Sequence, residues 1–65
     1  MNLADGILFE LERVRELLGD YKDIGPSGSF GAAMIEAVLK RADKAIISGD
    51  VVEILKSYGE LRDCK

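Results

Sequence analysis

Apolar side chains recur at alternating intervals of three and four residues along the first part of the chain. This spacing places them on one face of an α-helix and is typical of helices that pack on other helices. Asn2 can cap the start of the helix, and Asp5 lies near the positive end of its dipole. The pattern predicts a helix over about Leu3–Tyr21, with Gly19 weakening its last turn. Its apolar seam consists of Ala4, Ile7, Leu11, Val14, Leu18 and Tyr21.

A loop and a second helix are expected next. The stretch Asp23–Ser29 contains Pro26 and two glycines, which favour a turn over a continued helix. The second helix should begin near Ser27 or Ser29, either of which can cap it, and should run to about Ser48. It carries two adjacent apolar stripes, whereas a surface helix usually has one. It therefore needs two partners: the first helix, and either the third helix, another protomer or both. The first stripe holds Ala32, Ile35, Leu39, Ala42 and Ile46, and the second holds Phe30, Met34, Ala37, Val38 and Ala45.

Gly49 and Asp50 mark the boundary between the second helix and a third. A glycine commonly follows the last helical residue, and an aspartate commonly caps the next helix. The third helix is expected over about Val51–Arg62, followed by a frayed tail, Asp63–Lys65. The pattern predicts an all-α, three-helix arrangement in one domain, residues 1–65, made of a long helical hairpin and a short C-terminal helix. The apolar face of the third helix holds Val51, Ile54, Leu55, Tyr58 and Leu61.

The small size of the chain favours self-association. A chain of 65 residues has a marginal core, and small domains usually need a disulfide, a metal or a partner subunit. Cys64 is the only cysteine and histidine is absent, so an internal disulfide is excluded and a zinc site is not expected. Hydrophobic residues make up 48% of the chain, which is high for so small an interior. We therefore predict a homo-oligomer, a dimer or larger.

The charge of the chain argues against two classes of partner. Twelve acidic and nine basic side chains give a net charge of −3. Nucleic-acid binders and membrane-surface helices usually carry clusters of Lys and Arg. No apolar run reaches the length of a membrane span, and the N-terminus lacks the pattern of a signal peptide. We expect a cytoplasmic protein that binds neither nucleic acid nor membrane.

Catalysis is not expected either. No histidine is available as a base, and Cys64 lies close to a chain end where its thiol is hard to position. The carboxylates of the first helix lie on a face that should be solvated, and general acid–base chemistry needs a sheltered pair. Asp20 and Asp23 bracket a turn without the spacing of a calcium loop. We predict a non-enzymatic protein without catalytic residues, metal or cofactor.

The glycine-rich segment before the second helix is the best candidate for an anion site. Its serine hydroxyls, its free backbone N–H groups and the helix dipole favour a negative ligand, and its glycines permit close approach. The alternative is an ordinary connection between two helices. Arg41 lies beside the second apolar stripe, where it could hold a phosphate, cross an oligomer interface or reach past apolar surface to water. The predicted anion ligands are Ser27, Gly28, Ser29, Gly31 and Arg41.

Exposed apolar side chains indicate a protein interface. Phe9 lies among acidic residues on the polar face of the first helix, where an aromatic side chain can anchor a contact, although a single exposed apolar residue is also ordinary. The second stripe of the second helix offers further contact positions. The predicted interface consists of Phe9, Phe30, Met34, Val38 and Ala45.

Three segments of the second half of the chain carry a resemblance. The runs Phe30–Ile35, Ala42–Ile46 and Ser48–Val52, continued by Tyr58 and Leu61, resemble short accessory proteins of phages and prophages. That resemblance implies an inhibitor of host defences in the host cytoplasm. Such a protein either binds a host defence protein or sequesters a nucleotide-like signal between protomers of a helical oligomer. The alternative expectation is an adaptor that binds a partner protein through exposed apolar helix faces.

Overall fold

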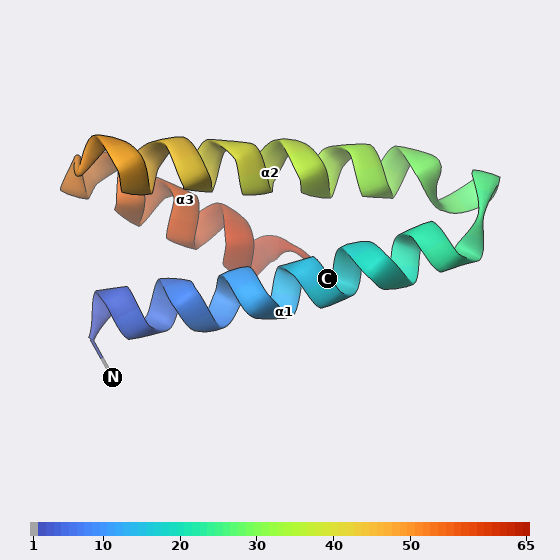
Figure 1. Ribbon diagram of the computed structural model, residues 1–65, viewed down its shortest axis with the longest axis horizontal. Coiled ribbons are helices and arrows are strands. Elements are labelled where there is room, and N and C mark those ends of the chain that lie inside the picture. Colours follow the sequence, from blue (N-terminus) through green and yellow to red (C-terminus); the bar gives the residue numbers. More distant parts are fainter. Residues whose placement is uncertain (1) are drawn as a thin grey trace.

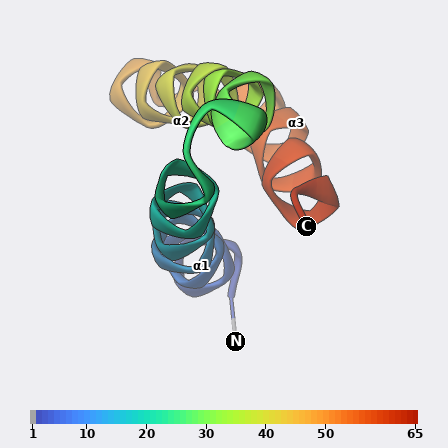
Figure 2. The same ribbon diagram turned by 90° about the vertical axis from the view of Figure 1, so that its right-hand side faces the viewer.

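The computed structural model describes residues 2–65, which form three α-helices and one short 3₁₀ turn. Helix α1 spans Leu3–Ile24, the turn η1 spans Pro26–Gly28, α2 spans Ser29–Ser48 and α3 spans Val51–Asp63. The helices α1 and α2 form a long antiparallel hairpin, and α3 folds back from the end of α2 toward the middle of α1 (Figure 1). Seen along the hairpin, the three helices occupy the corners of a triangle (Figure 2). The predicted all-α, three-helix fold is confirmed.

Most of the helix ends have the local chemistry that the sequence indicated. The side chain of Asn2 accepts a hydrogen bond from Asp5 N at 2.9 Å and caps α1. Gly49 ends α2 with a φ of 73°, a left-handed conformation that glycine adopts without strain. Asp50 then caps α3 by accepting from two backbone N–H groups of its first turn. These caps fix the corner that returns α3 along the hairpin.

One helix end and one helix cap differ from the sequence prediction. Helix α1 continues three residues past the predicted end, Tyr21, to Ile24, so Asp23 and Ile24 are helical and not part of the predicted loop; Leu18 and Tyr21 pack against the core and hold these last turns. Helix α2 begins at Ser29, but its N-cap residue is Gly28 and no side chain caps it. Neither Ser27 nor Ser29 therefore acts as the predicted cap. Within residues 2–65, no helix is both long and apolar enough to cross a membrane.

The core lies where the third helix meets the hairpin. Val14 of α1, Ala42 of α2 and Leu61 of α3 are fully buried at this junction. Burial of one leucine side chain stabilises a fold by roughly 1.5–3 kcal/mol, a large share for a small domain. The remaining large buried apolar side chains are Ile7, Leu11, Ile35 and Val38.

Two glycines lie directly beneath tyrosine side chains of neighbouring helices. A Cβ atom at Gly6 would lie 2.8 Å from Cε2 and from the hydroxyl oxygen of Tyr58, so a larger residue at this position would displace the tyrosine. A Cβ atom at Gly31 would lie 2.5 Å from the ring of Tyr21, which packs α1 onto the start of α2. These two contacts set the spacing of the helices at opposite ends of the hairpin.

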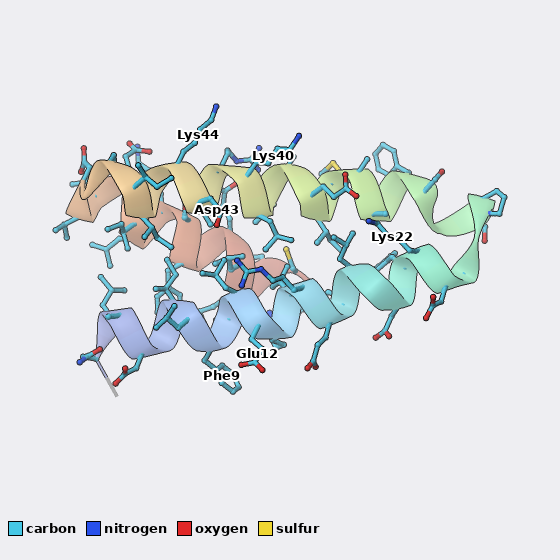
Figure 3. The ribbon with its side chains drawn as sticks, in the orientation of Figure 1. Phe9, Glu12, Lys22, Lys40, Asp43 and Lys44 are labelled. Carbon is cyan, nitrogen blue, oxygen red and sulfur yellow. The ribbon has the colours of Figure 1, made fainter. Side chains whose placement is uncertain are left out.

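Ion pairs along one flank align the hairpin. Lys22 Nζ lies 3.2 Å from Glu36 Oε1, and Arg15 Nη2 lies 3.8 Å from Asp43 Oδ1. The two pairs are seven residues apart on each helix, so they repeat every two turns and hold the helices in one register. Figure 3 shows Lys22 and Asp43 directed into the space between α1 and α2. Because these side chains are largely exposed, each pair contributes at most about 1 kcal/mol.

The end of α3 is tied to α1. Arg13 donates from Nη2 to Leu61 O at 2.9 Å and from Nη1 to Cys64 O at 3.0 Å, while its Nε donates to Glu10 Oε2 at 2.7 Å. The guanidinium thus satisfies backbone carbonyls at the negative end of the helix. Tyr21 Oη donates to the backbone oxygen of Lys65 at 2.8 Å. The tail is therefore held against α1, contrary to the prediction that it frays.

Candidate binding surface

An open groove lies between α1 and α2 beyond the end of α3. The groove exists because α3 has 13 residues and α2 has 20, so α3 stops about 10 Å short of the hairpin's closed end. The hollow has a volume of about 360 Å³. Its floor is largely apolar, and the last residues of α3 form one end. The lining residues are Tyr21, Gly31, Met34, Ile35, Val38, Glu60, Asp63, Cys64 and Lys65.

The residues of the second apolar stripe of α2 differ in exposure along the helix. Val38 and Ala45 are only 8% and 5% exposed, whereas Met34 and Phe30 are 56% and 78% exposed. Val38 and Ala45 face the chain's own third helix in this arrangement. Of the five residues predicted to form an interface, Phe9, Phe30 and Met34 are the ones that remain open to a partner.

The glycine-rich turn is explained by packing. A Cβ atom at Gly28 would collide with the backbone oxygen of Tyr21, and Gly31 lies under the ring of the same tyrosine. Both glycines are required for α1 and α2 to meet at the turn. Ser27 and Ser29 are exposed, so their hydroxyls remain accessible from solvent. The anion-binding role of this segment stays a prediction, because the packing gives its glycines a different reason to be present.

Arg41 pairs with α3 in this structure. Its Nη2 lies 2.7 Å from Glu60 Oε2, and its Nε lies 3.2 Å from the same oxygen. The hydrogen bond to Glu60, together with that carboxylate's charge, raises the pKa of Arg41 above its ordinary value. Twelve residues of helix separate Arg41 from Ser29, a distance of about 18 Å. One chain therefore does not bring the predicted anion ligands together.

Three cations line a second hollow, between α2 and α3. It has a volume of about 340 Å³ and contains Arg41, Lys44 and Lys56 together with Glu53 and Glu60. Two of the cations are paired with those carboxylates, at 2.7 Å for Arg41 and 3.6 Å for Lys56. Lys44 makes no ion pair within the described residues. The local charge is thus slightly positive.

Apolar surface also gathers at the open end of the hairpin. A hollow of about 290 Å³ lies between the start of α1, the end of α2 and the start of α3. Its walls are apolar on all three helices, and further large apolar side chains are exposed around the corner between α2 and α3. The lining residues are Leu3, Ala4, Ile7, Leu8, Ile46 and Ile54, and the exposed neighbours in sequence are Ile47, Val51, Val52 and Leu55.

The described residues offer little reactive chemistry. Burial raises the pKa of the Cys64 thiol, and nearby carboxylates add to that effect against the opposing charge of Arg13. Cys64 Sγ donates to the backbone oxygen of Glu60 at 3.5 Å. A protonated, half-buried thiol is a weak nucleophile. No group of three or more potential metal ligands occurs within residues 2–65.

Sequence reasoning missed the residues that shape the groove. The sequence pattern does not single out Arg13, although it fixes the end of α3 and hence the length of the open groove. Tyr21 was assigned only to the core seam, yet it forms one wall of the groove and binds the tail. Glu10, three residues before Arg13, predicts an ion pair on one helix face but not the distant carbonyls that Arg13 also binds. Comparisons with models of protein families, with curated proteins and with solved structures gave no significant match.

Proposed function

We propose that this protein is a non-enzymatic, self-associating binding protein, and that the groove beyond α3 receives a helix of a partner polypeptide. The observation that carries the proposal is the distribution of large apolar side chains within residues 2–65: ten are exposed and six are buried. The exposed ones are Leu8, Phe9, Ile24, Phe30, Met34, Ile46, Ile47, Val51, Val52 and Leu55.

The exposed surface supports association. The chain exposes 4495 Å² at a mass of 7.1 kDa, whereas a compact monomer of that mass exposes about 4,100 Å². Exposed apolar surface gathered at both ends of the hairpin is typical of protein interaction sites. Covering it with another polypeptide would supply the burial that a chain this short lacks.

The shape of the groove favours a helix as the partner element. The part of the furrow nearer the corner is already filled by α3, which packs on both α1 and α2. The open part continues that furrow for about 10 Å, roughly two helical turns. Met34 and Ile35 line its α2 side and Tyr21 lines its α1 side. An amphipathic helix with apolar residues at i, i+3, i+4 and i+7 would meet these walls as α3 does.

A displayed library of helical peptides with that apolar spacing tests the groove. We expect selected peptides to bind the wild-type protein and to lose at least about tenfold in affinity with Met34→Lys. Val52→Lys, at an exposed apolar site on the first turn of α3, is the matched control and should leave binding unchanged. A library without binders, or binders indifferent to Met34→Lys, would overturn the groove as a helix site.

Sedimentation equilibrium tests self-association directly. We expect the mean mass to rise above 7.1 kDa as the protein concentration increases. A constant mass of 7.1 kDa up to the highest soluble concentration would overturn this part of the proposal.

A second candidate function is the binding of a nucleotide-like anion, as an inhibitor or sponge would do. The hollow that contains Arg41, Lys44 and Lys56 supports it, because an anion there would meet three cations. Native mass spectrometry after titration with ATP tests this candidate. Retained ATP that is lost with Arg41→Ala, but not with Lys22→Ala, would support the site. No adduct at millimolar ATP would overturn it.

A further inference from the structure

The outer faces of α1 and α2 lie on opposite edges of the hairpin and carry opposite charge. Figure 3 shows Phe9 and Glu12 pointing away from α2, and Lys40 and Lys44 pointing away from α1. These faces are separate from the open groove and from the surfaces that pack inside the chain. Each one therefore remains available to another molecule.

The outer face of α1 is acidic around one aromatic side chain. Its carboxylates are exposed, and within residues 2–65 none of them takes part in an ion pair. Phe9 is 57% exposed among them. The residues at helical spacing along this face are Asp5, Phe9, Glu12, Glu16, Asp20 and Asp23.

The outer face of α2 has the complementary character. Lys40 and Lys44 are exposed and make no ion pair within the described part of the chain. Ile47 lies one turn further along the same face. It is 85% exposed, which is the largest exposed fraction among the exposed large apolar side chains. Ala33 is exposed near the other end of the same face. A positive stripe with an apolar end thus runs along α2.

The two faces match in one antiparallel register. When Phe9 is placed opposite Ile47, Glu12 falls opposite Lys44 and Glu16 falls opposite Lys40. Continued further, the same register sets Gly19 opposite Ala37. From Phe9 to Gly19, apolar or small residues then meet apolar residues and carboxylates meet lysines, over about 15 Å of helix. A second copy stacked in the same orientation presents its α1 antiparallel to α2, as α1 and α2 already lie within one chain.

Gly19 gives an independent reason to expect a close neighbour on this face. It lies inside α1, where glycine destabilises a helix by about 1 kcal/mol relative to alanine. Nothing within the chain requires it, because no atom lies within 4 Å of an added Cβ. A second helix packed against this face would supply the reason, since small residues let two helix backbones approach.

We propose that the acidic outer face of α1 binds the basic outer face of α2 in a second copy of this chain. The inference rests on the self-association in the proposed function and names its interface. The contact joins two different surfaces, so each copy can bind one neighbour on each edge, and repetition gives a chain or a ring of copies. A single helix pair falls in the small interface class, so assembly depends strongly on concentration.

Charge reversal tests the interface. The double variants Glu12→Lys/Glu16→Lys and Lys40→Glu/Lys44→Glu each place like charges on both faces. We expect each variant alone to associate at least about tenfold more weakly than the wild type in sedimentation experiments. An equimolar mixture should associate again, because each variant then offers the face that the other has lost. Lys56→Glu/Arg62→Glu, with an equal charge change on α3, should associate like the wild type.

The outcomes separate the interface from self-association in general. A wild-type protein that stays monomeric overturns both. A wild-type protein that associates, with charge variants that associate equally well, overturns this interface and leaves self-association through other surfaces. Weak variants that the mixture does not rescue also overturn the complementary pairing. Circular dichroism shows whether a charge-reversed variant keeps its helices. If one does not, the neutral double variants Glu12→Gln/Glu16→Gln and Lys40→Gln/Lys44→Gln replace the reversed ones. Association equal to that of the wild type in both neutral variants overturns the proposal.

Gly19 supplies a second test with a built-in control. Gly59 of α3 also has no atom within 4 Å of an added Cβ. Both Gly19→Gln and Gly59→Gln should leave the monomer folded, since glutamine favours helix over glycine. We expect Gly19→Gln to weaken association about tenfold and Gly59→Gln to leave it unchanged. Equal behaviour of the two variants would overturn a close contact at Gly19.

Discussion

The covered and open halves of the furrow between α1 and α2 are built from one stripe of α2 residues. Ala45 lies beneath α3 and Val38 at the border of the groove, and both are buried, while Met34 in the groove and Phe30 near the turn are exposed. All four residues are apolar, and all lie on the same face of a regular helix. The difference comes from the length and direction of α3. An apolar position is thus core or surface according to where a different helix ends.

The largest expected effect is a loss of stability in the covered half of the furrow. Leu61→Ala removes a fully buried side chain that packs at the junction of all three helices. We expect a loss of about 3 kcal/mol or more in the free energy of unfolding, enough to unfold most of so small a domain. Urea denaturation followed by circular dichroism measures it. Leu55→Ala, at an exposed site on the same helix, should change stability by less than about 0.5 kcal/mol.

The next comparison sets one half directly against the other. Val38→Ala should destabilise the monomer by about 2 kcal/mol, because it leaves a cavity in the buried core at the border of the groove. Met34→Ala, one turn away on the same stripe, should change the unfolding free energy of the dilute monomer by less than about 0.5 kcal/mol. Urea midpoints at low protein concentration measure both. Equal losses would mean that the open half is also covered within a single chain.

A smaller loss of stability is expected at the end of α3, which separates the two halves. Arg13→Ala removes the donors to Leu61 O and Cys64 O and should cost about 1–2 kcal/mol. Hydrogen exchange should accelerate at the last turn of α3, where the freed carbonyls face solvent. Arg15→Ala serves as the control, because its pair with Asp43 is exposed and 3.8 Å long. Unchanged exchange at residues 61–65 would show that Arg13 does not hold this end.

The smallest effect concerns alkaline pH. The pKa of Cys64 is raised in the folded protein, chiefly by burial, so the folded state holds the thiol proton more tightly than the unfolded chain. This contribution to stability is complete below the ordinary thiol value of about 8.5 and is lost as pH rises through the raised value. Cys64→Ala should therefore flatten the decline in urea stability above pH 8.5. An identical decline in both proteins would exclude the thiol as its cause.

The helices could be predicted from local sequence, but the position and lining of the groove depend on tertiary packing. The helix ends at Asn2, Gly49 and Asp50 could be predicted, because a capping residue contacts backbone groups within about four residues of itself. The continuation of α1 past Tyr21 to Ile24 depends on contacts with residues far along the sequence, and the helix propensity of the segment alone does not contain them.

The candidate site was less predictable for the same reason. Gly28 and Gly31 have the composition of an anion loop, yet each is required by one tyrosine that packs across the turn. Arg41 lies beside an apolar stripe, as the sequence indicated, but its pairing with Glu60 depends on how α3 returns. Arg13 contacts carbonyls 48 and 51 residues away, and no local pattern reveals such a partner.

The two tyrosines give the molecule a spectroscopic reporter in each half. The chain contains Tyr21, Tyr58 and no tryptophan, so its intrinsic fluorescence comes from these two rings. Tyr58 lies over Gly6 in the covered half, and Tyr21 lies over Gly31 at the open groove. Replacing either one with phenylalanine leaves a single emitter. Unfolding of the core and occupation of the groove can then be followed separately, without any attached label.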